Sequence, residues 1–149
     1  MQQQTDSFSK FGKSFQEKLC QLMLQDRPFC DQITEVLDIG FLETRYLQVF
    51  IPVILDYREK YGVHPSYEIL ATIFKSGITE YDAGVQKQVR DYYTRIVTSS
   101  AVDGAEFIKD TSMDFCRKQV LKQAMMKSVG LLKTSSFDEI SKVINDALK

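Results

Sequence analysis

Residues 106–133, which read EFIKDTSMDFCRKQVLKQAMMKSVGLLK, contain no proline and decide the fold class. As a single α-helix this stretch would be about 42 Å long. Its apolar residues fall on two faces rather than one. Because one neighbouring helix covers only one side of a helix, the pattern predicts two partners for this segment. One face carries Met113, Cys116, Val120, Ala124 and Leu131, and the other carries Leu121, Met125 and Leu132.

A second amphipathic helix is expected directly after the first. Thr134-Ser135 ends the long helix, and Ser136-x-x-Glu139 has the form of a capping box. A long helix, a short connection and a shorter helix make an antiparallel hairpin, here over residues 101–149. The second apolar face of the long helix must then be covered either by the rest of this chain or by another chain, and the sequence leaves both possibilities open. The stripe of the second helix is Phe137, Ile140, Val143, Ile144, Ala147 and Leu148.

Residues 11–100 predict a small bundle of further helices, the helical head, after a flexible leader over residues 1–10. A capping box at Ser14-x-x-Glu17 begins the first helix, and Pro28 opens a second one through Leu37. The third, Leu42–Tyr61, has Pro52 in its middle, which predicts a kink or two abutting helices.

Two more helices complete the predicted head. Pro65-Ser66 starts one that ends before Gly77, and Thr79 caps the next. The polar stretch 98–104 separates head from hairpin. The fold class is therefore predicted as all-α, a small N-terminal helical bundle followed by a C-terminal antiparallel hairpin, with residues 11–149 forming one domain. The stripe of the fifth helix is Val85, Val89, Tyr92 and Ile96.

The composition of the 149 residues is that of one globular domain, with 44% hydrophobic and 26% charged residues. Few turns are expected from three prolines and seven glycines, which argues against a β-sandwich or barrel. The formal net charge of −1 shows no general basic excess for nucleic-acid binding. The long helix has a local basic excess, so Arg117, Lys118 and Lys122 are candidates for weak nucleic-acid contacts, although solvated helix faces often look the same.

No catalytic, cofactor-binding or metal-ligating residue is predicted, and the chain is not expected to be an enzyme. His64 has no sequence pattern that supplies a nucleophile or an orienting carboxylate, so a solvated or capping histidine is favoured. The segment SFSKFGKS (7–14) lacks the first glycine of a phosphate-binding loop. The three cysteines form no zinc pattern and predict buried free thiols in a reducing compartment: Cys20, Cys30 and Cys116.

A cytoplasmic protein is expected from the absence of targeting features. Residues 1–10 lack the apolar core of a signal peptide. The longest apolar run, Val49–Leu55, has seven residues and includes a proline, which is far short of the ~20 residues that cross a bilayer.

Four segments together resemble the N-terminal domain of DnaB-like replicative DNA helicases, more the phage-type members than the bacterial ones. FGKSFQEKL (11–19) opens a helical head, and DIGFLETRYL (38–47) resembles the turn where a Phe leads into its third helix. YREKYGVHPS (57–66) resembles the helix–loop–Pro–helix junction that follows. FCRKQVLKQA (115–124) resembles the arginine-containing first helix of the C-terminal hairpin. The resemblance covers residues 11–149, and Pro52 departs from the family's pattern.

The resemblance implies a collar, that is, a ring-forming domain above the motor domains of the helicase, with no catalytic site of its own. Hairpins of two subunits would pair as dimers, and three dimers would close a ring in the primosome, where primase or a helicase loader would dock. A RecA-like motor with ATP and Mg, beyond Lys149 in a longer protein, would unwind DNA, so that this domain meets DNA only indirectly. The host compartment would be the cytoplasm of a bacterium or of a phage-infected cell. The implied subunit interface is Val120, Ala124, Met125, Ile140 and Ile144.

Two other readings remain open from the residues alone. A stand-alone helical adaptor or regulator would bind another protein through the same hairpin. A helical nucleic-acid binder would use the basic stripe of the long helix instead.

Overall fold

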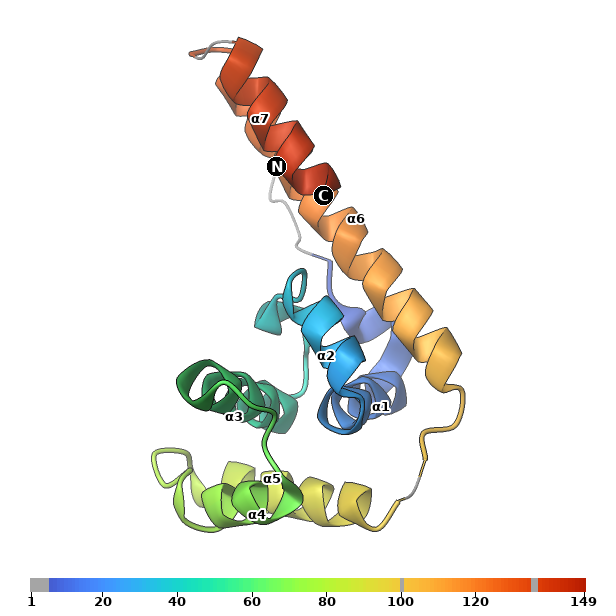
Figure 1. Cartoon of the computed structure of the whole chain (residues 1–149), viewed down its shortest axis with the longest axis vertical. Helices are drawn as coiled ribbons and strands as arrows, with labels where there is room; N and C mark the ends of the chain where they lie inside the picture. The colour runs from blue at the N-terminus through green and yellow to red at the C-terminus, as the bar shows by residue number, and fades with distance from the viewer. Residues whose placement is uncertain (1–5, 100, 135–136) are drawn as a thin grey trace.

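The computed structural model describes residues 6–99, 101–134 and 137–149. Over these residues the chain is all-α, as predicted, with seven α-helices, two 3₁₀ segments and no strand. The head holds α1 to α5, and α6 runs along the head before it projects away together with α7 (Figure 1). The elements are η1 (Phe8–Phe11), α1 (Gly12–Gln25), α2 (Arg27–Thr34), η2 (Ile39–Phe41), α3 (Arg45–Tyr61), α4 (Tyr67–Ser76), α5 (Ala83–Val97), α6 (Ala105–Leu131) and α7 (Phe137–Leu148).

The core of the head is built around α3 and α5, which pack against each other, and α1, which packs against α3. The predicted stripe of α5 is confirmed, since Val85, Val89, Tyr92 and Ile96 are all buried. The Tyr92 ring lies edge-on to Phe50 of α3, with ring centroids 5.0 Å apart, and its hydroxyl donates to the Glu17 carbonyl. A buried phenol with a hydrogen-bond acceptor ties α5 to α1 without leaving a polar atom unpaired.

The first and fifth helices begin at other residues than predicted. The helix α1 starts at Gly12, so Ser14 lies inside its first turn and caps nothing. The helix α5 is capped by Asp82, whose carboxylate accepts from the Val85 amide at 2.9 Å, so the prediction of Thr79 as the cap is wrong. Thr79 instead lies in the turn closed between Ile78 and Tyr81. An aspartate that reaches the third amide after it satisfies a free helix donor.

The helices α4 and α2 begin as the sequence predicts, but α2 ends earlier. Ser66 caps α4 as predicted, because its hydroxyl accepts from the Ile69 amide at 3.2 Å. The helix α2 follows the Asp26 cap with Pro28 in its first turn, but it ends at Thr34 rather than at Leu37. There the amide of Leu37 bonds back to Ile33, which closes a turn.

The leader predicted over residues 1–10 is wrong from Phe8 onward, and residues 1–5 lie outside the described part of the chain. Phe8 is fully buried, and the Ser7 hydroxyl caps the 3₁₀ turn that holds it. Its ring centroid lies 5.8 Å from that of Phe41 and 4.9 Å from that of Phe115. An aromatic side chain that finds such partners gains enough apolar burial to order a polar segment.

Pro52 does not divide the third helix. The helix α3 continues as one element from Arg45 to Tyr61, so the prediction of two abutting helices is wrong. The missing amide of Pro52 leaves the Gln48 carbonyl without its helical donor. Gly62, with a φ of 73°, then ends α3 in the left-handed conformation that a side chain disfavours.

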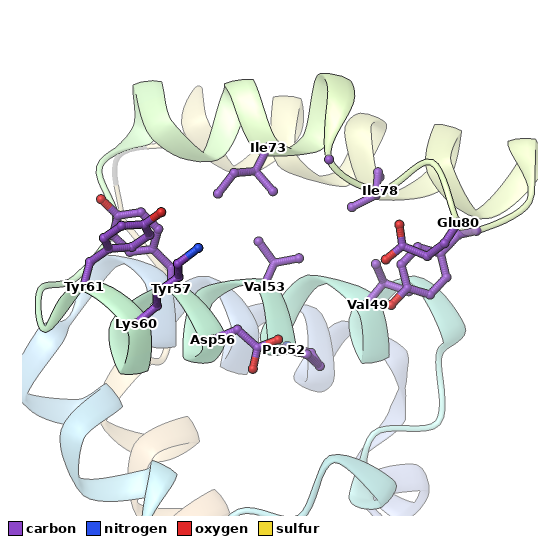
Figure 2. A pocket seen from close by; sticks show the side chains of 12 residues that line it. Val49, Pro52, Val53, Asp56, Tyr57, Lys60, Tyr61, Ile73, Ile78 and Glu80 are labelled. Atoms are coloured by element: carbon purple, nitrogen blue, oxygen red, sulfur yellow. The ribbon is translucent and has the colours of Figure 1, made fainter.

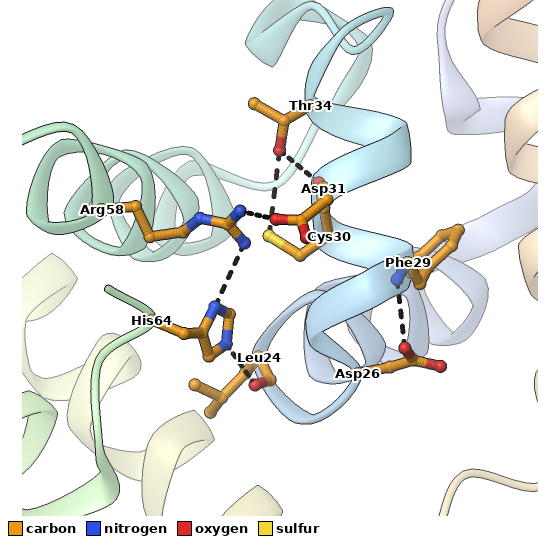
Figure 3. A network of polar contacts seen from close by, with 8 residues as sticks. All are labelled: Leu24, Asp26, Phe29, Cys30, Asp31, Thr34, Arg58 and His64. Atoms are coloured by element: carbon orange, nitrogen blue, oxygen red, sulfur yellow. Dashed lines mark hydrogen bonds and ion pairs between the residues drawn. The ribbon is translucent and has the colours of Figure 1, made fainter. Parts of the chain in front are cut away.

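His64 joins α1 to α3 and is a capping histidine, one of the two roles expected for it (Figure 3). Its Nε2 donates to the Leu24 carbonyl in the last turn of α1 at 2.6 Å, and its Nδ1 accepts from Arg58 at 3.1 Å. Because a carbonyl only accepts and a guanidinium only donates, these bonds select the neutral Nε2–H tautomer. Arg58 also pairs with Asp31 of α2.

This network predicts that the head loses stability in mild acid. Burial, followed by the positive charges of Arg58 and Arg27, lowers the pKa of His64 below its ordinary value of 6.5, against the bond to Leu24 that raises it. The folded protein therefore binds this proton less readily than the unfolded chain. Stability present above pH 6.5 should fall as the pH drops toward the folded-state pKa. Urea unfolding at about pH 5.5 and about pH 7.5 measures the change.

The matched variant for that measurement is His64→Gln. Its amide can make the same two hydrogen bonds but does not titrate, and His64 is the chain's single histidine. We expect the pH dependence to become shallower in the variant. An identical pH dependence in both proteins would show that His64 does not carry it.

Two buried glutamines of α1 give a second prediction about the core. Gln16 is bonded at both ends, since Nε2 donates to the Gly12 carbonyl at 3.3 Å and Oε1 accepts from the Glu43 amide at 2.9 Å. The Nε2 of Gln21 finds no partner among the described residues. We therefore expect Gln16→Met to lower the free energy of unfolding by about 1–3 kcal/mol and Gln21→Met to leave it equal or higher. Chemical denaturation of the two variants tests this, and equal losses would contradict it.

Candidate self-association surface

The first half of α6 anchors the hairpin to the head. Ile108, Phe115 and Cys116 are buried in the core of the head. The Phe115 ring lies among the aromatic rings of Phe8, at 4.9 Å, and Phe41, at 5.3 Å. Burial also raises the pKa of the Cys116 thiol to about 12, which keeps it protonated. Like Cys20 and Cys30 it is a buried free thiol, as predicted.

An ion pair and a hydrogen bond also hold α6 in place against the rest of the chain. Lys109 lies 2.5 Å from Asp26, the residue that caps α2, and this bond lowers the pKa of the Asp26 carboxyl. Further along, the Gln119 amide donates to Asp6 at 3.2 Å and thereby lowers its pKa. A helix fixed by both apolar and polar contacts presents its remaining half at a defined angle.

The basic stripe predicted as a nucleic-acid candidate is largely paired with acidic side chains. Lys118 lies 2.9 Å from Asp114, and Lys122 lies 3.6 Å from Asp6. Arg117 lines a cleft of about 750 Å³ between α2, α6 and the end of α7, which also contains carboxylates. Pairing of this kind weakens the local potential that would attract phosphates. The cleft is further lined by Gln32, Glu35, Val36, Met113, Lys118, Val120, Leu121, Asp146, Ala147, Leu148 and Lys149.

The second half of α6 packs against α7. The two helices run antiparallel, because the end of α7 at Ala147 lines the same cleft as Val120 in the middle of α6 (Figure 1). Ala124 and Ser128 are the buried residues of this half. Both are small, and the Ser128 hydroxyl donates to the Ala124 carbonyl at 2.8 Å. Small side chains at this seam let α7 approach closely.

A row of large apolar side chains remains exposed beside this seam. None of the residues of α7, all of which are described, is buried. The second half of α6 and its end likewise leave large side chains in solvent. We call the following set the hairpin flank, with exposed fractions in parentheses: Met125 (56%), Val129 (62%), Leu132 (71%), Phe137 (82%) and Leu148 (64%).

Helix geometry places the members of the hairpin flank on the same side. Met125 and Val129 of α6 and its C-cap Leu132, which still has helical backbone angles, are spaced i, i+4 and i+7, about 100° past the Ala124 seam. On α7, Phe137 and Leu148 are spaced i and i+11. An antiparallel pair of helices has a local two-fold axis, so positions rotated in the same sense from the seam face the same way. The result is a row of apolar side chains at Met125, Val129 and Leu132, with Phe137 and Leu148 near the two ends of α7 and the polar Ser141 and Asn145 between them.

The five interface residues implied by the resemblance divide into two groups. Ala124 is buried, and Val120, Ile140 and Ile144 are partly buried where α6 meets α7. Met125 alone lies on the hairpin flank. The sequence reasoning did not select Val129, and it assigned Phe137 and Leu148 to the stripe that meets α6. The small pair Ala124 and Ser128, four residues apart, is the signal that could have located the seam.

A metal centre is absent from the part of the chain that the structure describes. His, Cys, Asp and Glu side chains form no group there that could hold a metal ion. Among the same residues, every helix is too short or too polar to cross a bilayer.

Compared with protein-family models, curated proteins and solved structures, the chain gives no significant match.

Proposed function

We propose that this chain is a helical collar module that joins copies of itself through the hairpin flank. The observation that supports this most is that α6, its C-cap Leu132 and α7 leave five large apolar side chains exposed. A group of large apolar side chains that stay exposed near one another is typical of an interaction site.

The energetics favour a second copy as the partner. Full burial of a large apolar side chain contributes about 1.5–3 kcal/mol. A contact related by two-fold symmetry buries the hairpin flank of both chains, which doubles that gain. The sum is large enough to offset the loss of translational and rotational freedom, about 4–15 kcal/mol on association.

The collar would serve a replicative DNA helicase of the DnaB-like, phage-type kind that the four segments resemble. The module would arrange subunits in a ring and present docking surfaces for primase or a helicase loader. ATP binding, with Mg, and DNA unwinding would belong to a RecA-like motor outside these 149 residues. The collar itself would then meet DNA only indirectly, in the cytoplasm of a bacterium or a phage-infected cell.

A stand-alone adaptor is the second candidate. It is favoured by a separate apolar groove on the head, lined by Tyr57, Tyr61 and Ile73. An adaptor would use the hairpin flank for a different protein and remain monomeric by itself.

Sedimentation velocity over a range of concentrations separates the two candidates. The collar predicts species of at least two copies of the 17.2-kDa chain, with a fraction that rises with concentration. A strict monomer up to about 1 mM, where even a weak contact is populated, would overturn the collar and leave the adaptor.

A further inference from the structure

A groove on the head, away from the hairpin, lies between α3 and α4 (Figure 2). It consists of two adjoining hollows of about 280 and 420 Å³ that share Tyr57, Tyr61 and Ile73. Val53 of α3 and Ile73 of α4 face each other across it, and the two tyrosines stand at one end. We call this surface the head groove, defined by Val53, Tyr57, Tyr61, Ile69 and Ile73.

Core packing holds the two helices that form the head groove. The helices α3 and α4 both pack against α5, and the rings of Phe50 of α3 and Phe74 of α4 stack with centroids 5.3 Å apart. Both phenylalanines are buried, and the Phe74 ring also contacts Tyr93 of α5 at 5.2 Å. Since core packing holds both walls, a ligand would not have to order them.

The lining combines exposed apolar side chains with negative charge. Tyr61 is 57% exposed and Ile69 37% exposed, and the rings of Tyr57 and Tyr61 lie 4.6 Å apart. Tyrosine offers a large apolar face with few rotatable bonds, which suits recognition. Three carboxylates line the two hollows, those of Asp56, Glu68 and Glu80, and so does one ammonium group, that of Lys60. The formal net charge of the lining is therefore −2.

We propose that the head groove binds a short segment of a partner protein that carries two apolar side chains and at least one Lys or Arg. Each hollow takes one apolar side chain. The acidic rim attracts the cation toward a carboxylate. The Tyr61 ring already has the ammonium of Lys60 over it, 5.3 Å from the ring centroid, which shows that this ring can hold a cation. The groove is open along its length, and it therefore fits an extended chain better than an enclosed small molecule. Neither self-association nor a role in replication is needed for this binding.

A peptide library tests the proposal directly. Random peptides of about 12 residues, long enough to lie across a groove, are selected on the wild-type chain. Binding is then measured by titration into the isotope-labelled chain, with amide shifts as the readout. We expect enriched peptides to combine apolar residues with Lys or Arg and to shift residues of α3 and α4.

Matched variants assign the site. Tyr61→Ser combined with Ile69→Ser should weaken the selected peptides about tenfold or more, as loss of central contacts does. Val97→Ser should not, although Val97 of α5 is exposed to the same 37% as Ile69. Reversing the rim charge with Glu68→Lys and Glu80→Lys should also weaken binding, whereas Asp103→Lys, an exposed control, should not.

Three results would overturn the proposal. The first is selection of peptides that bind the double serine variant as tightly as the wild type. The second is enrichment of acidic peptides, which would contradict the charge argument. The third is a concentration-dependent shift of groove amides without any peptide, which would assign the head groove to a second copy of this chain.

Discussion

Replacing Phe115 with alanine is expected to lower the free energy of unfolding by about 3–5 kcal/mol, the loss typical of a buried phenylalanine. Phe115 is 4% exposed and, together with Ile108 and Cys116, packs α6 into the core of the head. Its ring contacts those of Phe8, Phe11 and Phe41 at centroid distances of 4.9, 5.9 and 5.3 Å. Its removal leaves a cavity shared by η1, η2 and α6, because a close-packed core collapses only in part.

Urea unfolding followed by circular dichroism measures this loss. The control is Phe107→Ala on the same helix, where the side chain is 66% exposed and the change should stay within about 0.5 kcal/mol. Phe115→Leu keeps most of the volume and remains foldable if the alanine variant does not, with an expected loss of about 1 kcal/mol. Equal effects at residues 107 and 115 would contradict the anchoring role of Phe115.

The double variant Val129→Glu/Phe137→Glu is expected to weaken self-association by about 100-fold or more, which is roughly 2.7 kcal/mol. Both side chains lie on the hairpin flank and are 62% and 82% exposed in the single chain. In a two-fold contact the variant brings four carboxylates into a desolvated, apolar surface. Unpaired charges of like sign are strongly disfavoured there.

The stability of the monomer should hardly change in this variant, because neither side chain contributes to the core. Sedimentation equilibrium gives the dissociation constant, and circular dichroism checks the fold. Val63→Glu is the matched control, since Val63 lies in the head beyond the end of α3 and is 51% exposed. An unchanged dissociation constant in the double variant would remove the hairpin flank from the contact.

The periodic elements of this fold were predictable from the sequence. The α5 stripe from Val85 to Ile96 faces the core because its spacing matches the helical repeat. The length of α6 followed from a long segment without proline, and Ser66 had the cap chemistry that the structure uses. Each of these features depends on neighbours within a few residues along the chain.

Features that depend on distant residues were not predictable. Phe8 lies in a polar segment, and its burial requires Phe41 and Phe115 from remote parts of the sequence. Ser14 and Thr79 both match a cap pattern, but Phe8 and η1 set the start of α1, and Asp82 competes successfully for α5. Local patterns state which residues can cap a helix, and tertiary packing selects among them.

The same limit applies to the candidate surface. The two apolar faces of α6 were visible in the sequence, but not which of them α7 would cover. The small side chains of Ala124 and Ser128 let α7 pack against this face of α6, and Met125 and Val129 remain exposed on the face that α7 does not cover. The position of a covering helix depends on side-chain size at the seam, to which a count of apolar residues is insensitive.

The most direct test of the self-association surface is an isotope-filtered NOE experiment on a mixture of ¹³C-methyl-labelled and unlabelled chains. Such spectra report only contacts between different copies. We expect intermolecular NOEs at the methyl groups of Met125, Val129 and Leu132. Their absence at concentrations where the chain is associated, or intermolecular NOEs only from residues of the head, would contradict a contact through the hairpin.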